Sequence, residues 1–484
     1  MKLKKLLALS MASLMAFSVV GCGSSNNAGS SSSDKADNAA ADTEKTDDAA
    51  SDDSASADGI KKYTDIELGK DYTDLTATIK VINHRTDMAD ADYAGKNWDA
   101  YIAEFNKMYP NITVDIETIT DYANETLLRL QDENWGDVMG IPAVDKGDLS
   151  TYFMSYGTQE DVESQVNYIT NWLYQGEVYG IPTTANAQGV VYNKKVFKDA
   201  GIEELPKTPD EFIADLKLIK EKTDAIPLYT NYAAEWTMGA WDAYLGGTAY
   251  GDPDAMNKML HTSNPFSDEG TGAGRYNVYK VLYDAVANGL TEDDYTTTDW
   301  EGCKGMINNG EIGTMVLGSW AVSQMKAAGD NADDIGYMPF PITVDGKQYA
   351  SAGADYNYGI NVNSSDENKE ASLVFVKWMT EKSGFSYNEG GLPIAKGDTN
   401  LPDVYADFDG VDFVTDDPAY EGEEDLMNTL NADSELAINA GGNQKVMSIV
   451  EHAANGDESF DDIMNEWNEA WTSAQESNSV EINK

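Results

Sequence analysis

Few side chains in this sequence have a type and spacing that could support nucleophilic or metal-dependent chemistry. The 484 residues include two cysteines, Cys22 and Cys303, and three histidines, and none of these is spaced as in a zinc site. A Gly-x-Ser-x-Gly nucleophile elbow, a His-Glu-x-x-His motif and a phosphate-binding Gly-Lys loop are all absent from the sequence. The sequence therefore carries no signature of these catalytic classes, and we expect no cofactor.

Carboxylates are the other groups that could act in catalysis, and the sequence contains 84 Asp and Glu residues. Two carboxylates suffice for glycoside hydrolysis, but pairs of acidic residues are expected by chance in a chain with so many of them. Their presence therefore does not distinguish an enzyme from a protein that is not one. The acidic run over residues 407–425 lacks the spaced oxygen ligands and the mid-loop glycine of an EF-hand. We interpret this run as a solvated loop and predict no metal site.

Cys303 lies in a segment with helical spacing of apolar residues. Trp300, Cys303 and Ile307 share one face of that helix. None of the histidines, at positions 84, 261 and 452, is paired locally with the thiol. We therefore interpret Cys303 as a small buried apolar residue and not as a catalytic thiol.

Aromatic and acidic residues are both abundant. The chain has ten Trp and 27 Tyr, and several of them stand where helix or strand periodicity does not require an apolar residue. Its formal net charge is −51. A surface of this sign does not suit the phosphate backbone of nucleic acids or an anionic lipid surface. We interpret the charge as a solvated surface that does not identify a ligand.

Short strands alternate with amphipathic helices from about residue 75 onward. The pattern predicts strands over residues 76–83 and 112–116. Helices are expected over these segments: 98–108, 209–219, 278–286 and 460–474. This alternation predicts an α/β fold with mostly parallel sheets covered by helices. The absence of internal repeats disfavours an adhesin or a structural surface protein.

The N-terminal residues have the three parts of a secretory signal. Three lysines precede an apolar stretch over residues 6–20, which is too short to span a membrane comfortably. The following Val-Val-Gly-Cys resembles a bacterial lipobox, so we expect residues 1–21 to be a signal peptide and Cys22 to be lipidated. An ordinary signal peptide with an incidental cysteine is the alternative. Residues 22–74 are expected to form an acidic, Ser-rich flexible tether.

Five stretches resemble the extracellular solute-binding proteins of carbohydrate ABC importers, the group that includes maltose- and oligosaccharide-binding proteins. Each stretch alone is a weak signal, but all occur in the order of that family. They are residues 98–112, 178–182 with 189–197, 206–212, 313–320 and 390–393.

The resemblance implies two α/β lobes joined by two or three crossing segments, with ligand held in the cleft between them. One lobe would comprise residues 75–184 plus 353–389, and the other residues 185–352 plus 390–478. The resemblance also implies a carbohydrate ligand, the permease subunits of an ABC importer as partners, and a protein that is not an enzyme. We expect a monomer that is held outside the cytoplasm on the bacterial cell membrane by its N-terminal lipid.

Aromatic side chains are the first candidates for such a site, because indole rings stack on the apolar face of a pyranose. Trp320 follows an expected strand and stands where the family has a sugar-stacking tryptophan; a core tryptophan is the alternative. Trp236 follows a loop where the family often places another aromatic residue, and Trp241 is a rival for that role.

Polar candidates lie near the ends of strands and at the expected crossings. His84 and Arg85 end the first strand, and an ion pair of Arg85 with a nearby aspartate is the alternative for that residue. Asn186 would contact ligand from the first crossing or cap the hinge. The remaining candidates are Asp355 and Tyr356 at the second crossing and Glu389 at the third.

Two other functions remain open at this point. One is a surface glycoside hydrolase, which would release reducing ends from a glycan instead of binding it stoichiometrically. The other is a binding protein of the same architecture for a different solute, such as a polyamine, a metal or a peptide. The polar residues after the first strand do not identify one sugar.

Overall fold

The computed structural model describes residues 59–482, except residues 92, 94, 441 and 442. The expected signal peptide and Cys22 lie outside these residues. The first sheet has the strand order β2-β1-β3-β12-β6. Its strands are β1 (Ala77–Asn83), β2 (Ile112–Thr118), β3 (Val138–Gly140), β6 (Ile181–Pro182) and β12 (Asn357–Ile360). We call this sheet and the helices packed on it lobe 1.

A second sheet forms lobe 2, with the order β13-β11-β7-β9-β8 and β10 also paired to β7. Its strands are β7 (Ala185–Asn193), β8 (Ile226–Leu228), β9 (Ile312–Gly318), β10 (Ile335–Pro339), β11 (Tyr349–Ala354) and β13 (Asp412–Val414). Strands β4 (Leu173–Tyr174) and β5 (Glu177–Val178) form a small hairpin. The fold is therefore α/β and two-lobed.

Strand direction corrects one expectation from the sequence. β1 runs parallel to β2 and β3, and β8 runs parallel to β9. The strands next to the crossings are different: β12 is antiparallel to β3, and β7 is antiparallel to β9, β10 and β11. The sheets are mixed because a chain that returns from the other lobe enters the sheet against the direction of the local strands.

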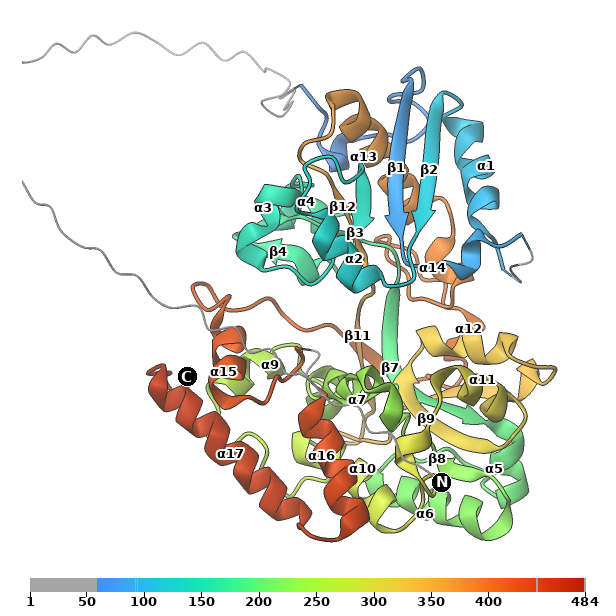
Figure 1. Cartoon of the computed structure of the whole chain (residues 1–484), viewed down its shortest axis with the longest axis vertical. Coiled ribbons are helices and arrows are strands. Elements are labelled where there is room, and N and C mark those ends of the chain that lie inside the picture. Colours follow the sequence, from blue (N-terminus) through green and yellow to red (C-terminus); the bar gives the residue numbers. More distant parts are fainter. Residues whose placement is uncertain (1–58, 92, 94, 441–442, 483–484) are drawn as a thin grey trace, which may run out of the picture. The chain divides into compact units, whose positions relative to one another are not determined.

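The helices begin at side-chain caps where the sequence provides them. Thr208 and Glu211 form a capping box at the start of α6, with Pro209 in the first turn. In Figure 1, α1 lies beside β2 and α13 beside β1, as their contacts require. The longer helices are α1 (Trp98–Met108), α2 (Tyr122–Arg129), α5 (Lys194–Ala200), α6 (Pro209–Lys222), α10 (Arg275–Ala287), α11 (Trp300–Asn308), α12 (Trp320–Ala327), α13 (Asp366–Glu381), α15 (Leu426–Ser434), α16 (Gln444–Asn455) and α17 (Phe460–Ser477). The shorter helices are α3 (Leu149–Tyr152), α4 (Gln159–Glu163), α7 (Trp236–Gly239), α8 (Gly247–Tyr250), α9 (Ala255–Leu260) and α14 (Phe385–Asn388). No helix among the described residues is both long enough and apolar enough to cross a bilayer.

The chain passes between the two sheets at short segments. The first passage joins β6 to β7, the second joins β11 to β12, and a third follows α14. The third passage contacts both lobes. Leu392 N–H donates to Ala185 O of β7, and the side chains of Leu392 and Ile394 pack in a core of lobe 2, whereas the backbone of residues 394–396 bonds to lobe 1. Asn167 N–H donates to Ile394 O at 2.7 Å, and Lys396 N–H donates to Gln165 O at 2.8 Å.

Residues 59–74 also differ from the expected tether. Ile60, Tyr63 and Ile66 are buried and pack in the core of lobe 1 with β1 and α1. The compositional signal of a tether ends near residue 58, and these three apolar side chains are spaced so that they cover the lobe. The folded part therefore begins near Ile60.

Candidate binding site

A cavity of about 840 Å³ opens where the chain passes between the two sheets. Its wall combines residues from lobe 1, lobe 2 and the passages. The wall residues are His84, Arg85, Thr120, Asp121, Tyr122, Ala123, Thr184, Asn186, Gln188, Trp236, Trp300, Trp320, Ser323, Gln324, Gly353, Ala354, Asp355, Tyr356 and Glu389. The volume lies in the range of about 300–1,000 Å³ that small-molecule sites usually have.

Three tryptophans form the wall that lobe 2 contributes. Trp236, Trp300 and Trp320 are the first residues of α7, α11 and α12. Their ring centroids lie 5.1–5.7 Å apart, and their planes are inclined to one another by 47–80°. The side chain of Trp236 remains 45% exposed, which is unusual for an indole within an aromatic cluster. The group therefore presents indole faces to the cavity in several directions.

Trp241 does not belong to this wall. Its indole is 2% exposed and packs against Tyr244 and Phe340 in the core of lobe 2. The interpretation of Trp241 as an alternative to Trp236 is therefore wrong in this structure. Trp241 lies in a short 3₁₀ turn, Ala240–Tyr244, whose inner face is buried.

His84 faces the tryptophans from lobe 1, at the end of β1. Its imidazole lies 4.6 Å from the ring of Tyr356 and 5.7 Å from that of Tyr122. Burial lowers the pKa of His84, and this effect outweighs the opposing influence of Asp355. The imidazole is therefore neutral at pH 7 and presents one donor and one acceptor.

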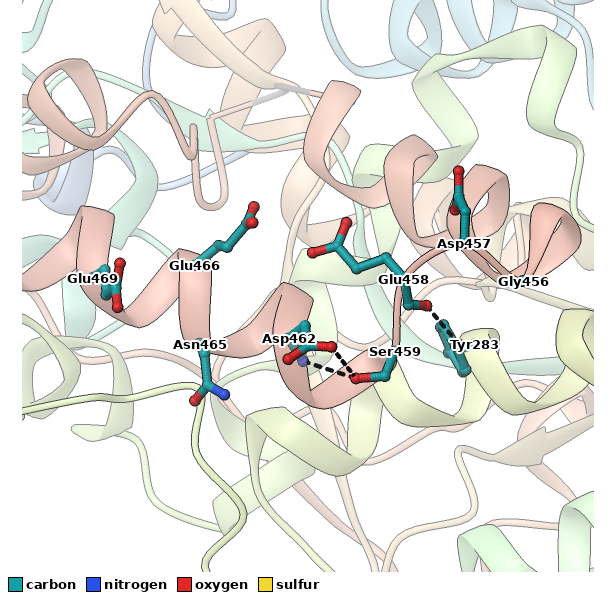
Figure 2. A pocket seen from close by; sticks show the side chains of 9 residues that line it. All are labelled: Tyr283, Gly456, Asp457, Glu458, Ser459, Asp462, Asn465, Glu466 and Glu469. Carbon is teal, nitrogen blue, oxygen red and sulfur yellow. Dashed lines mark hydrogen bonds between the residues drawn. The ribbon is translucent and has the colours of Figure 1, made fainter.

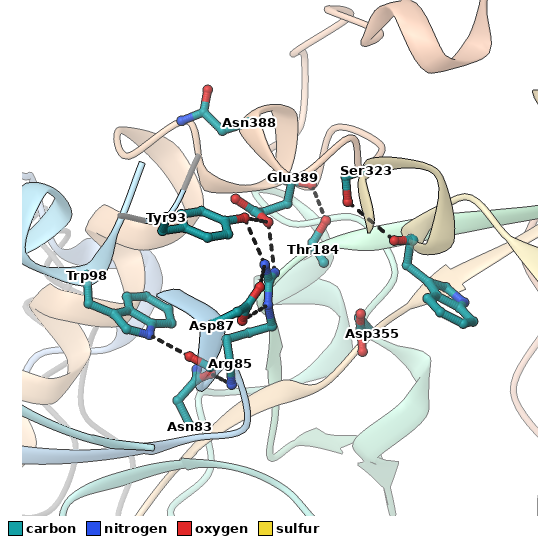
Figure 3. A network of polar contacts seen from close by, with 12 residues as sticks. Asn83, Arg85, Asp87, Tyr93, Trp98, Thr184, Ser323, Asp355, Asn388 and Glu389 are labelled. Atoms are coloured by element: carbon teal, nitrogen blue, oxygen red, sulfur yellow. Dashed lines mark hydrogen bonds and ion pairs between the residues drawn. The ribbon is translucent and has the colours of Figure 1, made fainter. Parts of the chain in front are cut away.

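Arg85 stands beside His84 in a dense polar network (Figure 3). Its guanidinium forms ion pairs with Asp87 and Glu389, each at 2.8 Å, and donates to Tyr93 Oη at 2.9 Å. Burial alone would lower the pKa of Arg85, but the two carboxylates raise it. Arg85 therefore both forms an ion pair with an aspartate, Asp87, and lies on the cavity wall.

Asn186 lies at the start of β7, directly after the first passage, and Asp355 lies in the second passage. Asn186 Nδ2 donates to Asp355 Oδ2 at 3.2 Å. Asp355 Oδ1 accepts from the backbone N–H of Tyr356 at 2.8 Å. Both carboxylate oxygens are thus oriented by the chain, and each retains a lone pair that can accept a hydroxyl group.

A model of the family described as bacterial extracellular solute-binding protein matches residues 90–384, which is more than half of the chain. The chain belongs to this family. Since the matched residues include all but three of the nineteen that line the cavity, the match covers most of the site as well as the fold.

Solved structures similar to this solute-binding protein cover nearly all of its folded part. It shares 57% identity and a TM-score of 0.82 with a manno-oligosaccharide-specific solute-binding protein of Bifidobacterium animalis subsp. lactis in complex with mannotriose. A binding protein of an ABC transporter from the same organism, in complex with mannobiose, shares 56% identity and the same TM-score. Each match covers 86% of this chain and 99% of the other. A multiple sugar-binding protein of Streptococcus mutans is 26% identical over 320 residues, which are 62% of this chain and 73% of that protein.

Several residues of the cavity wall in this solute-binding protein were not predicted from the sequence. Trp300 was recognised only as a residue on the same helix face as Cys303 and Ile307; it is partly exposed at the start of α11. The turn before α2 contributes Thr120 and Asp121, and α2 itself contributes Tyr122 and Ala123. This turn could have been found, since it follows β2 at the sheet edge where β1 ends with His84.

Cys303 is buried, as expected, and its thiol donates to Trp300 O at 3.0 Å. Burial raises the pKa of this thiol to about 12. Among the described residues, no three His, Cys, Asp or Glu side chains are grouped so that they could hold a metal ion.

A second hollow, of about 650 Å³, lies between the end of α16 and the start of α17 (Figure 2). Its wall carries the carboxylates of Asp457, Glu458, Asp462, Glu466 and Glu469. Burial and the neighbouring acids raise the pKa of Glu458. This hollow has no aromatic face comparable with the tryptophan wall, so the first cavity is the better candidate.

Proposed function

We propose that this protein is the receptor of a carbohydrate ABC importer and binds an uncharged manno-oligosaccharide of two or three sugar units. The observation that carries the proposal is the wall of three tryptophans opposite hydrogen-bonding groups that are fixed by the chain. The similarity at 56–57% identity to proteins solved with mannobiose and mannotriose supports the same sugar class.

The two walls match the two kinds of surface on a sugar ring. A pyranose has a face of C–H groups, which packs on indole rings, and an edge of hydroxyl groups, which need hydrogen-bond partners. Trp236, Trp300 and Trp320 supply the rings. Opposite them, neutral His84 can both donate and accept, and Asp355 can accept. Stacking of this kind contributes about 1 kcal/mol for each good contact beyond burial, by analogy with aromatic pairs.

The charges on the wall favour an uncharged sugar over an acidic one. Arg85 is the one basic side chain on the wall, and Asp87 and Glu389 already hold it. The acidic wall residues are Asp121, Asp355 and Glu389. An anionic ligand would therefore meet carboxylates and a cation that is already neutralised, which is unfavourable in a partly buried site.

We further propose the organisation that the sequence predicted, with two adjustments. Lobe 1 comprises residues 60–184 plus 355–389, and lobe 2 comprises residues 185–354 plus 390–478. Cys22 carries the lipid that holds the monomeric receptor outside the cytoplasm, where it delivers ligand to the permease. The protein binds its ligand without converting it.

Isothermal titration of the purified protein tests the sugar class directly. We expect mannobiose and mannotriose to bind with one site per chain and to raise the melting temperature, since ligand binds only the folded state. Maltotriose, N,N′-diacetylchitobiose and a mannuronate disaccharide serve as comparison ligands. Binding of one of these with no response to manno-oligosaccharides would contradict the proposed sugar class.

The same sample tests the enzymatic alternative. We expect mannotriose to be recovered intact after prolonged incubation with excess protein, with no increase in reducing ends. Progressive release of mannose or mannobiose would contradict a purely binding function.

A further inference from the structure

A chain of buried hydrogen bonds begins below the cavity at Tyr405. The Tyr405 hydroxyl donates to Ser319 Oγ at 2.9 Å, and Ser319 Oγ donates to Asn186 Oδ1 at 3.2 Å. Asn186 Nδ2 then donates to Asp355 Oδ2 on the cavity wall, also at 3.2 Å. We call this chain the Tyr405–Asp355 relay. It joins the 3₁₀ turn Asp403–Tyr405 of lobe 2, the turn before α12, the start of β7 and the second passage.

Every donor in the relay points the same way, toward the carboxylate of Asp355. Hydrogen bonds arranged in this order polarise one another, and the carboxylate is the strongest acceptor available at their end. The three inner members are deeply buried: Tyr405 is 5% exposed, Ser319 1% and Asn186 7%. Water therefore cannot easily replace a lost member, and removal of one leaves its neighbour unsatisfied.

Ser319 has the largest number of bonds in the relay. Its hydroxyl also accepts from the backbone N–H of Ala187 at 3.2 Å, so its one donor and both acceptor positions are filled. Its own backbone N–H donates to Ala187 O at 2.9 Å. Ser319 is thus fixed to β7 at two points, and the next residue is Trp320 of the tryptophan wall.

We propose that Ser319 and Tyr405 are positioning residues for ligand binding, which hold the aromatic wall at Trp320 and the polar pair Asn186–Asp355 in one fixed geometry. Neither residue lines the cavity. This inference rests on the proposed function, because it assigns to the two residues a role in the affinity for the sugar. Without the relay, Asn186 Oδ1 loses its donor, so the pair Asn186–Asp355 is held less firmly before ligand arrives.

The change Tyr405→Phe removes one hydroxyl and retains the ring that packs against Phe408 and Phe413. We expect it to weaken mannotriose binding about three- to tenfold, the usual effect of one hydrogen bond that no longer supports a site. Ser319→Ala should weaken binding at least as much, because it removes two steps of the relay. Ser319→Thr retains the hydroxyl and should bind within about twofold of the wild type.

Tyr244→Phe is the matched control, because it also removes one buried tyrosine hydroxyl from lobe 2. That hydroxyl donates to Gly189 O at 2.7 Å and has no part in the relay. We expect Tyr405→Phe and Tyr244→Phe to lower the melting temperature of the unliganded protein similarly, and only Tyr405→Phe to weaken binding. Dissociation constants are measured by calorimetry well below the melting temperature, so that all variants are folded.

Two results would overturn the relay's role. The first is a wild-type affinity for mannotriose in the Tyr405→Phe variant, and the second is an equal loss of affinity in Tyr244→Phe. If the wild type binds none of the manno-oligosaccharides, the proposed function fails instead. The role of the relay is then tested by the fluorescence spectrum of Trp320, taken as the difference from the Trp320→Phe variant. A shift of this spectrum in Tyr405→Phe but not in Tyr244→Phe supports the relay. The absence of a shift in Tyr405→Phe overturns it.

Discussion

Trp320 is the side chain whose removal should reduce ligand affinity most. It is half-buried in the tryptophan wall, and its ring centroid lies 5.7 Å from those of both Trp236 and Trp300. We expect Trp320→Ala to weaken mannotriose binding tenfold or more, because the sugar loses its stacking face and the other two indoles lose support. Calorimetry measures the affinity, and circular dichroism verifies the fold.

Trp241→Phe provides the comparison for this prediction. Trp241 is buried away from the cavity, so its replacement should lower the melting temperature and leave the affinity for mannotriose unchanged. Unchanged affinity in Trp320→Ala, or a large loss of affinity in Trp241→Phe, would contradict the assignment of the two tryptophans.

His84 predicts how stability depends on pH. Its pKa in the folded protein is lowered from the ordinary value of 6.5 by burial, with Asp355 and Asp87 opposing the shift and Arg85 supporting it. Below about pH 6.5 the unfolded chain takes up a proton that the folded chain does not, so His84 destabilises the fold as pH falls. We expect the melting temperature of the wild type, relative to His84→Gln, to fall between pH 7.5 and pH 5.

His452 offers a control of opposite sign on the surface. Asp457, which bonds its Nδ1 at 2.9 Å, raises the pKa of His452. Its contribution is present at low pH and is lost as pH rises through the raised pKa. The wild type should therefore gain stability relative to His452→Gln as pH falls. A relative melting temperature that moves in the same direction for both variants would refute this explanation.

The site could be predicted from the sequence to the extent that its residues follow the ends of strands or lie at crossings. His84 and Arg85 follow the last residue of β1, and Asn186, Asp355 and Glu389 adjoin the three passages. Their places in the chain were therefore sufficient to predict that they lie on the cavity wall. The ion pair of Arg85 with Glu389 could not be predicted from the sequence, because the two residues are far apart in the sequence and meet only in the folded chain.

Among the elements, the third passage is packed so closely that one position must be glycine. A Cβ atom at Gly391 would lie 1.9 Å from Thr184 Oγ1, 2.7 Å from Ser386 Oγ and 2.9 Å from Ala185 O. Thr184 lines the cavity, so the extra methyl group would displace part of its wall. We expect Gly391→Ala to lower the free energy of unfolding by about 1–3 kcal/mol, as overpacking does, and to weaken mannotriose binding. Urea denaturation and calorimetry measure the two effects.

Gly305→Ala is the matched substitution for this test. Gly305 lies within α11, and the nearest atom to an added Cβ is Ala328 O at 3.8 Å. Helix propensity favours alanine there by about 1 kcal/mol, so stability should stay the same or rise. Tolerance of alanine at Gly391 to the same degree as at Gly305 would mean that the passage is not tightly packed.

Helices and their caps follow local rules, which explains why the sequence predicted them well. The expected helices over residues 98–108 and 209–219 match α1 and α6, and Thr208 caps α6 through a capping box with Glu211. Strand direction is different, because it depends on how the chain returns from the other lobe, and neither β7 nor β12 carries a local signal of its antiparallel partners. The role of the apolar residues at 60, 63 and 66 could likewise be recognised only from the structure, which shows the core that they cover.

At the level of the whole molecule, the cavity depends on both lobes, because His84 and Tyr122 face the tryptophan wall across short passages. A ligand that contacts both walls binds more tightly when the lobes are close together than when they are apart. The difference between these two binding free energies is the amount by which the ligand stabilises the closed arrangement. The peptide segments between the sheets are few, so rotation about them changes little of either core. We therefore expect ligand to draw the lobes together.

Small-angle X-ray scattering with and without saturating mannotriose measures this closure. The radius of gyration of the wild type should fall on ligand binding, because the lobes approach one another while each retains its own core. Trp320→Ala at the same ligand concentration should show a smaller decrease, since its weakened site is occupied in a smaller fraction of the molecules. Glu389→Gln provides an independent test, because it removes one carboxylate that forms an ion pair with Arg85. A higher mannotriose concentration should then be needed for the same decrease in the radius of gyration. Identical profiles of the free and the saturated wild type would show that the sugar binds without lobe closure.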